Sequence, residues 1–166
     1  MKIIAFLQNQ WFNDPEGVKA MLDRQRECGE YTQEQMRERV RRRLIHYALF
    51  AGCLTGRRLK KAFGELTSTI IWEEASRVIS GNARDFHPPD EHHIKNVLAT
   101  EKPDVILSFG KANRTVFERL CPRPTSDIHV IYMPHPAARQ ATVPQELADG
   151  EMALQLFMIE HKAKAV

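Results

Sequence analysis

Residues 128–136 read Ile128-His129-Val130-Ile131-Tyr132-Met133-Pro134-His135-Pro136, an apolar run that ends at a histidine between two prolines. β-Branched and aromatic side chains dominate the run, which predicts a strand with a buried middle and an exposed end. The prolines restrain the backbone on both sides of His135, and histidine titrates near neutral pH. His135 is therefore a candidate reactive group, and an ordinary proline-rich turn is the alternative.

Three further apolar runs, at residues 2–7, 68–72 and 104–109, also have the length and composition of buried strands. Between the runs, spacing and capping residues predict helices at 15–26, 32–48, 55–63, 73–79, 90–101, 110–120 and from 144 onward. Strands that alternate with helices favour right-handed crossovers and a parallel sheet. The sequence therefore predicts one domain over residues 1–166, a three-layer α/β/α sandwich with a four-stranded parallel sheet.

Capping residues fix where several of these helices should begin. Asp14 precedes Pro15, Thr32 is followed by a glutamine at the capping-box spacing, and Thr55 and Asp90 precede later helices. We expect each of these side chains to accept a hydrogen bond from the first turn of its helix.

The composition excludes several classes of protein. With 166 residues, of which 43% are hydrophobic, the chain is long enough to bury a real core. Its three cysteines are widely spaced and odd in number, so we expect no disulfide framework, no metal site and no cofactor. The N-terminal apolar run is short, and no stretch approaches the length of a membrane span, which predicts a cytoplasmic protein without a membrane partner.

Positive charge is clustered in the first part of the chain, although the net charge is only +3. Residues 37–43 contain five arginines, and residues 57–61 contain two arginines and two lysines. Such runs are typical of solvated helix faces, but two runs close together could also form a phosphate-binding surface.

Polar residues follow each of the four expected strands. In parallel α/β sheets, ligands bind beyond the carboxyl ends of the strands, which meet at one edge. The residues expected there are Gln8 and Asn9, then Glu73 and Glu74, then Gly110, Lys111 and Asn113, and finally His135.

These segments, taken in order, resemble the uracil-DNA glycosylase superfamily over most of the chain. Residues 49–59, Leu-Phe-Ala-Gly-Cys-Leu-Thr-Gly-Arg-Arg-Leu, are similar to the family's Pro-Phe-x-Gly-x-x-Gly-x-Leu-Leu with one extra residue. Residues 105–112, Val-Ile-Leu-Ser-Phe-Gly-Lys-Ala, match its strand-to-helix turn, and His135-Pro136 matches the His-Pro pair of its second motif.

The chain departs from the family where the family reads uracil. Residues 7–11, Leu-Gln-Asn-Gln-Trp, lack the glycine and proline of the family's first motif, and Ala137 replaces the serine after His-Pro. Trp72 and Glu73 stand in the region of the base-reading asparagine, and the cysteines of the iron–sulfur branch are absent. The resemblance therefore implies a divergent, non-iron–sulfur member that acts on a base, either uracil or a modified base.

The resemblance implies two catalytic residues. Asn9 would orient the attacking water, and His135 would donate a hydrogen bond to an oxygen of the departing base. An amide positions water but accepts its proton poorly, so slower chemistry is expected than with an aspartate. The alternative for Asn9, and for its neighbour Gln8, is simple turn formation.

Four residues are implied in base binding: Gln8, Trp11, Phe50 and Glu73. Phe50 would stack on a base rotated out of the helix, and Glu73 would read an exocyclic amine. Packing in the core is the alternative for Phe50, and a favourable position in the first turn of a helix is the alternative for Glu73.

Four basic residues are implied in contacts with the DNA backbone: Arg57, Arg58, Lys111 and Arg139. Arg139 follows the histidine at the place where the family inserts a wedge residue into the duplex. DNA is thus the expected partner of a monomeric, metal-free protein.

The function expected from these residues is that of a DNA glycosylase, which flips a base and hydrolyses its N-glycosidic bond to leave an abasic site. DNA repair and defence against phage with modified bases are both possible settings. Two alternatives remain open: a non-catalytic nucleic-acid-binding module of the same fold, and a nucleotide hydrolase or transferase that holds phosphate at Gly110-Lys111.

Overall fold

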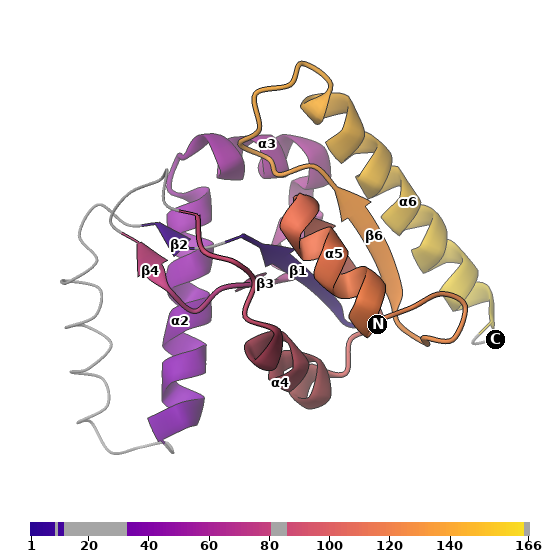
Figure 1. Cartoon of the computed structure of the whole chain (residues 1–166). Helices are drawn as coiled ribbons and strands as arrows, with labels where there is room; N and C mark the ends of the chain where they lie inside the picture. Colours follow the sequence, from indigo (N-terminus) through magenta and orange to yellow (C-terminus); the bar gives the residue numbers. More distant parts are fainter. Residues whose placement is uncertain (9, 12–32, 81–85, 165–166) are drawn as a thin grey trace.

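The computed structural model describes residues 1–8, 10–11, 33–80 and 86–164. Its main sheet has four strands, β1 (Ile3–Leu7), β3 (Ile71–Glu74), β5 (Val105–Phe109) and β6 (His129–Met133). The strands are all parallel and lie in the order β3-β1-β5-β6 (Figure 1). The predicted α/β fold with a four-stranded parallel sheet is confirmed.

The helices are α2 (Gln33–Phe50), α3 (Leu54–Phe63), α4 (Glu91–Glu101), α5 (Lys111–Leu120) and α6 (Val143–Lys164), with a short 3-10 helix, η1 (Gly64–Ser68), after α3. Figure 1 shows α5 in front of the sheet and α6 along β6. Among the described residues, no helix is long and apolar enough to cross a membrane.

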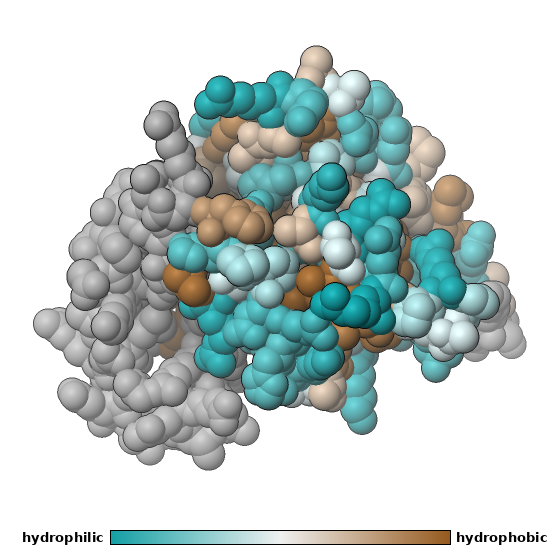
Figure 2. Space-filling view, viewed as in Figure 1, coloured by the Kyte–Doolittle hydropathy of each residue, from teal (hydrophilic) through white to brown (hydrophobic). Residues whose placement is uncertain are grey.

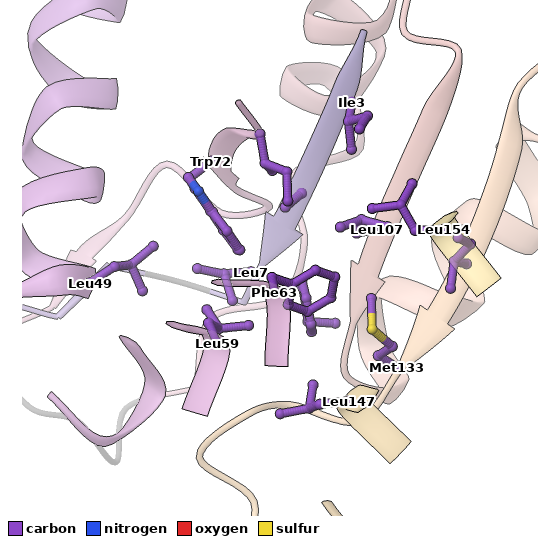
Figure 3. Close-up of a cluster of buried hydrophobic side chains, with 14 of the residues drawn as sticks. Ile3, Leu7, Leu49, Leu59, Phe63, Trp72, Leu107, Met133, Leu147 and Leu154 are labelled. Carbon is purple, nitrogen blue, oxygen red and sulfur yellow. The ribbon is translucent and has the colours of Figure 1, made fainter. Parts of the chain in front are cut away.

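Alternate residues of the strands contribute to two separate hydrophobic clusters, as expected for a sheet buried on both faces. Ile3, Ala5 and Leu7 of β1 belong to the first cluster, which also holds side chains from α2, α3 and α6 (Figure 3). Ile4 and Phe6 belong to the second, together with side chains from α4 and α5. Both faces of the strands are therefore covered by helices.

The coloured part of the face shown in Figure 2 is largely hydrophilic, with apolar residues scattered between polar ones. Scattered apolar side chains of this kind are normal on a folded domain. The buried apolar side chains of the described residues form the two clusters.

The middle of the chain differs from the prediction. Glu73 and Glu74 do not open a helix over 73–79, because they belong to β3 and pair with Phe6 and Leu7 of β1. The segment then ends in β4 (Ile79–Ser80), which pairs in parallel with β2 (Gln10–Trp11) in a small second sheet that was not predicted. Strand pairing here overrides the helix propensity of the glutamates.

The start of β3 and the cap of α3 also differ from the prediction. The strand begins at Ile71 rather than Ser68, since residues 64–68 form η1, where the Thr67 and Ser68 hydroxyls donate to carbonyls three residues back. Helix α3 is capped by Cys53 rather than Thr55, because the Cys53 sulfur accepts a hydrogen bond from the Gly56 amide.

The three other predicted capping residues have different outcomes. The predicted cap at Asp90 is confirmed, since its carboxylate accepts from the His93 amide at 3.0 Å. Asp14, Thr32 and the helix predicted over 15–26 lie outside the described residues.

Helix α3 approaches the end of α2 so closely that only glycine fits at position 56. A Cβ atom on Gly56 would lie 1.5 Å from the backbone oxygen of Leu49. Because that neighbour is backbone rather than a flexible side chain, the two helices would have to separate to accept a larger residue.

We therefore predict that Gly56→Ala lowers the free energy of unfolding by at least ~3 kcal/mol, the upper end of ordinary overpacking costs. Gly64→Ala is the control, because Gly64 has open space around it but a positive φ of 51°. That strain should cost only about 1–2 kcal/mol. Urea unfolding measures both, and equal losses would contradict the close approach of α2 and α3.

Candidate functional site

His135 lies beside the turn between β5 and α5. The Gly110 amide donates to the Met133 carbonyl at 2.9 Å, which extends the pairing of β5 and β6 by one bond. A Cβ atom on Gly110 would lie 3.6 Å from the Cβ of His135, which is van der Waals distance, so the two residues are neighbours. The positive φ of Gly110, 89°, also favours glycine there. The structure thus brings together two of the predicted strand ends.

Asn113 ties the ends of β1 and β5 together. Its side chain is 1% exposed, and its amide nitrogen donates to the carbonyls of Phe6, Leu7 and Phe109 at 3.1, 2.9 and 3.0 Å. Three carbonyls around one group identify that group as the NH₂, which fixes the orientation of the amide. Asn113 was predicted to lie at this edge, and its contacts with the backbone show that it supports the edge from inside.

The imidazole of His135 has one nitrogen already engaged. Nδ1 accepts a hydrogen bond from the Ala137 amide at 3.2 Å. An accepting Nδ1 carries no proton, so the neutral ring carries its proton on Nε2. Burial lowers the pKa of His135 from its ordinary value, which favours this neutral form. His135 can therefore donate one hydrogen bond, from Nε2.

Arg58 holds the turn that carries His135. Its Nη1 donates to the carbonyls of Pro136 and Ala138 at 2.6 and 2.8 Å. The side chain reaches this turn from α3, nearly eighty residues earlier in the sequence. Nothing in the local sequence indicates this contact, and the predicted contact of Arg58 with DNA phosphate stays a prediction.

Phe50 lies at the end of α2, half-buried against the first hydrophobic cluster. Its ring meets Trp72 edge-on, with centroids 5.6 Å apart, and is tilted against His46 at 4.8 Å. Trp72 is itself held by its indole nitrogen, which donates to the Thr67 carbonyl at 2.9 Å. Phe50 thus makes core packing contacts, as the alternative to base binding expects. Stacking of Phe50 on a base stays a prediction.

Glu73 is fully buried in β3, beside an arginine and a histidine. Its carboxylate lies 3.2 Å from Nε of Arg42 and 3.5 Å from Nε2 of His93. Arg42 also reaches Glu101 at 2.7 Å, so one guanidinium joins β3 to α4. The alternative role for Glu73, a favourable position in the first turn of a helix, is wrong, because Glu73 lies in a strand. Recognition of an exocyclic amine by Glu73 stays a prediction.

Sequence reasoning missed Arg42 and His93. Arg42 lies in a run of arginines that was assigned to a solvated face, and nothing in the spacing distinguishes it from its neighbours. His93 follows the Asp90 cap, where only the packing of α4 against the sheet shows that its side chain is buried.

The remaining basic candidates are on the surface. Arg57 is exposed and donates to the Gly52 carbonyl at 2.6 Å, within its own helix connection. Lys111, in the first turn of α5, and Arg139, after the His135 turn, are also exposed. Their contacts with a DNA backbone stay predictions.

The segment that corresponds to the family's first motif, residues 7–11, is described only in part. Gln8 is half-buried, and its carbonyl accepts from the Ser76 amide at 3.2 Å. Trp11 belongs to β2, where its backbone pairs with Ser80, but its side chain and the whole of Asn9 lie outside the described residues.

No group of three or more His, Cys, Asp or Glu side chains within the described ranges is arranged to hold a metal ion. Cys53 and Cys121 are free cysteines. The site as described offers hydrogen-bond donors and aromatic surface.

No protein-family model matches the chain, and no curated protein matches it. The resemblance to the uracil-DNA glycosylase superfamily therefore depends on the motifs quoted above.

For His135 we predict an imidazole that titrates below its ordinary value of 6.5 in the folded protein. Because the folded state binds this proton more weakly than the unfolded chain does, stability should fall as the pH drops below 6.5. Imidazole ¹⁵N spectra measure both the pKa and the tautomer, and His135→Gln identifies the resonance. A pKa at or above the ordinary value would contradict the burial of the ring.

For Glu101 we predict a contribution to stability that depends on pH. Burial raises its pKa, but the hydrogen bonds and charges of Arg42 and Lys2 outweigh burial and hold the pKa below its ordinary value. This stabilisation is present above the ordinary carboxylate pKa and is lost as the pH falls through the lowered value.

The Tm difference between the natural protein and Glu101→Gln should therefore be larger at pH 7 than at pH 3. Glu65→Gln, which removes an exposed carboxylate from η1, controls for the change in net charge. A Glu101→Gln difference that is the same at both pH values would rule out the ionic contribution.

Proposed function

We propose that this protein is a metal-free DNA glycosylase that flips a base, either unmodified or modified, and hydrolyses its N-glycosidic bond. The observation that carries the proposal is the His135 turn, where a neutral imidazole is left with its Nε2 proton to donate. The motifs shared with the uracil-DNA glycosylase superfamily support the same reaction.

Cleavage of an N-glycosidic bond requires a hydrogen-bond donor at the departing base. When the bond between base and sugar breaks, negative charge develops on an oxygen of the base while positive charge develops on the sugar. A preorganised hydrogen-bond donor at that oxygen is worth about 2.7–4 kcal/mol of transition-state stabilisation. A neutral imidazole suits this role because it donates without adding a positive charge that would oppose the charge on the sugar.

The remaining roles follow the resemblance. Asn9 would orient the water, Phe50 would present a ring to the flipped base, and Lys111 and Arg139 would contact phosphates from the surface. DNA is then the partner of a monomer in the cytoplasm, either in repair or in defence against phage with modified bases.

The nucleotide hydrolase or transferase is less well supported. Phosphate sites at strand-to-helix turns use free backbone amides. The Gly110 amide is already bonded to the Met133 carbonyl, so it cannot donate to a phosphate without breaking the strand pairing.

The test is a panel of duplexes carrying uracil, mismatched thymine, or hydroxymethylated or glycosylated cytosine, assayed for abasic sites. We expect product from at least one duplex and a rate about 10²–10³-fold lower for His135→Ala, the loss expected for one preorganised donor. His92→Ala, which changes an exposed histidine in α4, is the matched control.

Absence of product from every duplex with enzyme in excess would overturn the proposal. If DNA still bound with a steep dependence on salt, that result would favour the non-catalytic binding module. Asn9→Ala provides a second check, since loss of the water-orienting amide should slow hydrolysis but leave DNA affinity unchanged.

A further inference from the structure

We propose that Arg58 is a positioning residue for His135: its guanidinium clamps residues 135–138 and thereby selects the ring nitrogen that donates. The effect on catalysis rests on the proposed function, whereas the effect on the ring of His135 does not. The proposal assigns Arg58 a role different from the phosphate contact expected from the sequence.

The clamp is visible in four hydrogen bonds within one short turn. Arg58 donates to the carbonyls of Pro136 and Ala138, which draws both carbonyls toward the same nitrogen. The Ala138 amide donates to the His135 carbonyl at 2.8 Å, and the Ala137 amide donates to Nδ1. The backbone that places the Ala137 amide against Nδ1 is therefore the same backbone that Arg58 holds.

The clamp is anchored in the core of the protein. Arg58 precedes Leu59, which is fully buried, and α3 also buries Gly56 and Phe63. The turn is held from its own side as well, because Ala138 packs against the first hydrophobic cluster. Arg58 thus links a rigid helix to a turn that contains no regular secondary structure of its own.

Arginine suits this position for a physical reason. Hydrogen bonds from a charged donor are about twice as strong as neutral ones, and the planar guanidinium loses little freedom when it is held. Lysine carries the charge and several N–H donors on one nitrogen, but not the rigid plane that fixes their directions, so it should restore the clamp only in part. Alanine removes both the charge and the donors.

Arg57 provides a control within the same helix. It is the adjacent residue and carries the same charge, but it is exposed and donates to Gly52 rather than to the His135 turn. A general effect of positive charge in α3 should appear equally in Arg57→Ala and Arg58→Ala. An effect of the clamp on the ring of His135 should appear only in Arg58→Ala.

The first measurement uses imidazole ¹⁵N spectra of the free protein. We expect His135 to show a proton on Nε2 and an accepting Nδ1 in the natural protein and in Arg57→Ala. In Arg58→Ala the two tautomers should become mixed, and Arg58→Lys should lie between. Circular dichroism and urea unfolding show whether each variant is folded, and Arg58→Lys and Arg58→Gln provide the test if Arg58→Ala is not.

The second measurement is kinetic and uses a duplex that gives product in the panel. A small displacement of a group at the reacting centre can cost about 10²-fold in rate. We therefore expect kcat to fall about 10–100-fold in Arg58→Ala, with KM within about twofold and partial recovery in Arg58→Lys.

The outcomes separate this proposal from the glycosylase proposal. A folded Arg58→Ala protein with an unchanged His135 spectrum overturns the clamp, whatever the activity. A changed spectrum in a protein that cuts no duplex supports the clamp and counts against the glycosylase. A third outcome is that Arg58→Ala leaves the His135 spectrum unchanged but weakens DNA binding and reduces the slope of affinity against salt concentration by about one phosphate contact. In that case Arg58 binds the DNA backbone and the clamp is wrong.

Discussion

The buried amide of Asn113 is the contact on which the candidate site depends. Its NH₂ group donates to carbonyls at the ends of β1 and β5, where two adjacent strands stop. The same residue lies in the first turn of α5. One side chain thus fixes the strand ends and the start of the helix beside Gly110 and His135.

A second constraint acts at the other edge of the sheet. Glu73 has no exposed surface, and a buried carboxylate is tolerated only when it is paired. Arg42 supplies one partner from α2 and His93 another from α4, while Arg42 continues to Glu101. The Glu73 carboxylate, which the sequence analysis places in base binding as an expectation, therefore also helps to hold α2 and α4 against the edge strand β3.

Patterns of local sequence predicted much of the fold. Buried strands of β-branched residues and the Asp90 cap follow from local chemistry, and they were found. The helix expected over 73–79 was wrong because pairing with β1, which is distant in sequence, decides that segment. Arg58 and His93 were unpredictable for the same reason, since their partners are set by tertiary packing.

The His135 turn shows how a weak local signal gains meaning from distant contacts. Two prolines restrict the backbone, but proline has no amide hydrogen, so a hydrogen bond can hold the backbone of Pro136 only through its carbonyl. Arg58 bonds that carbonyl, and the free amide of Ala137 then turns toward Nδ1. The Pro-His-Pro sequence and the guanidinium are therefore complementary: the prolines limit the conformations of the turn, and the arginine selects the one that leaves Nε2 to donate.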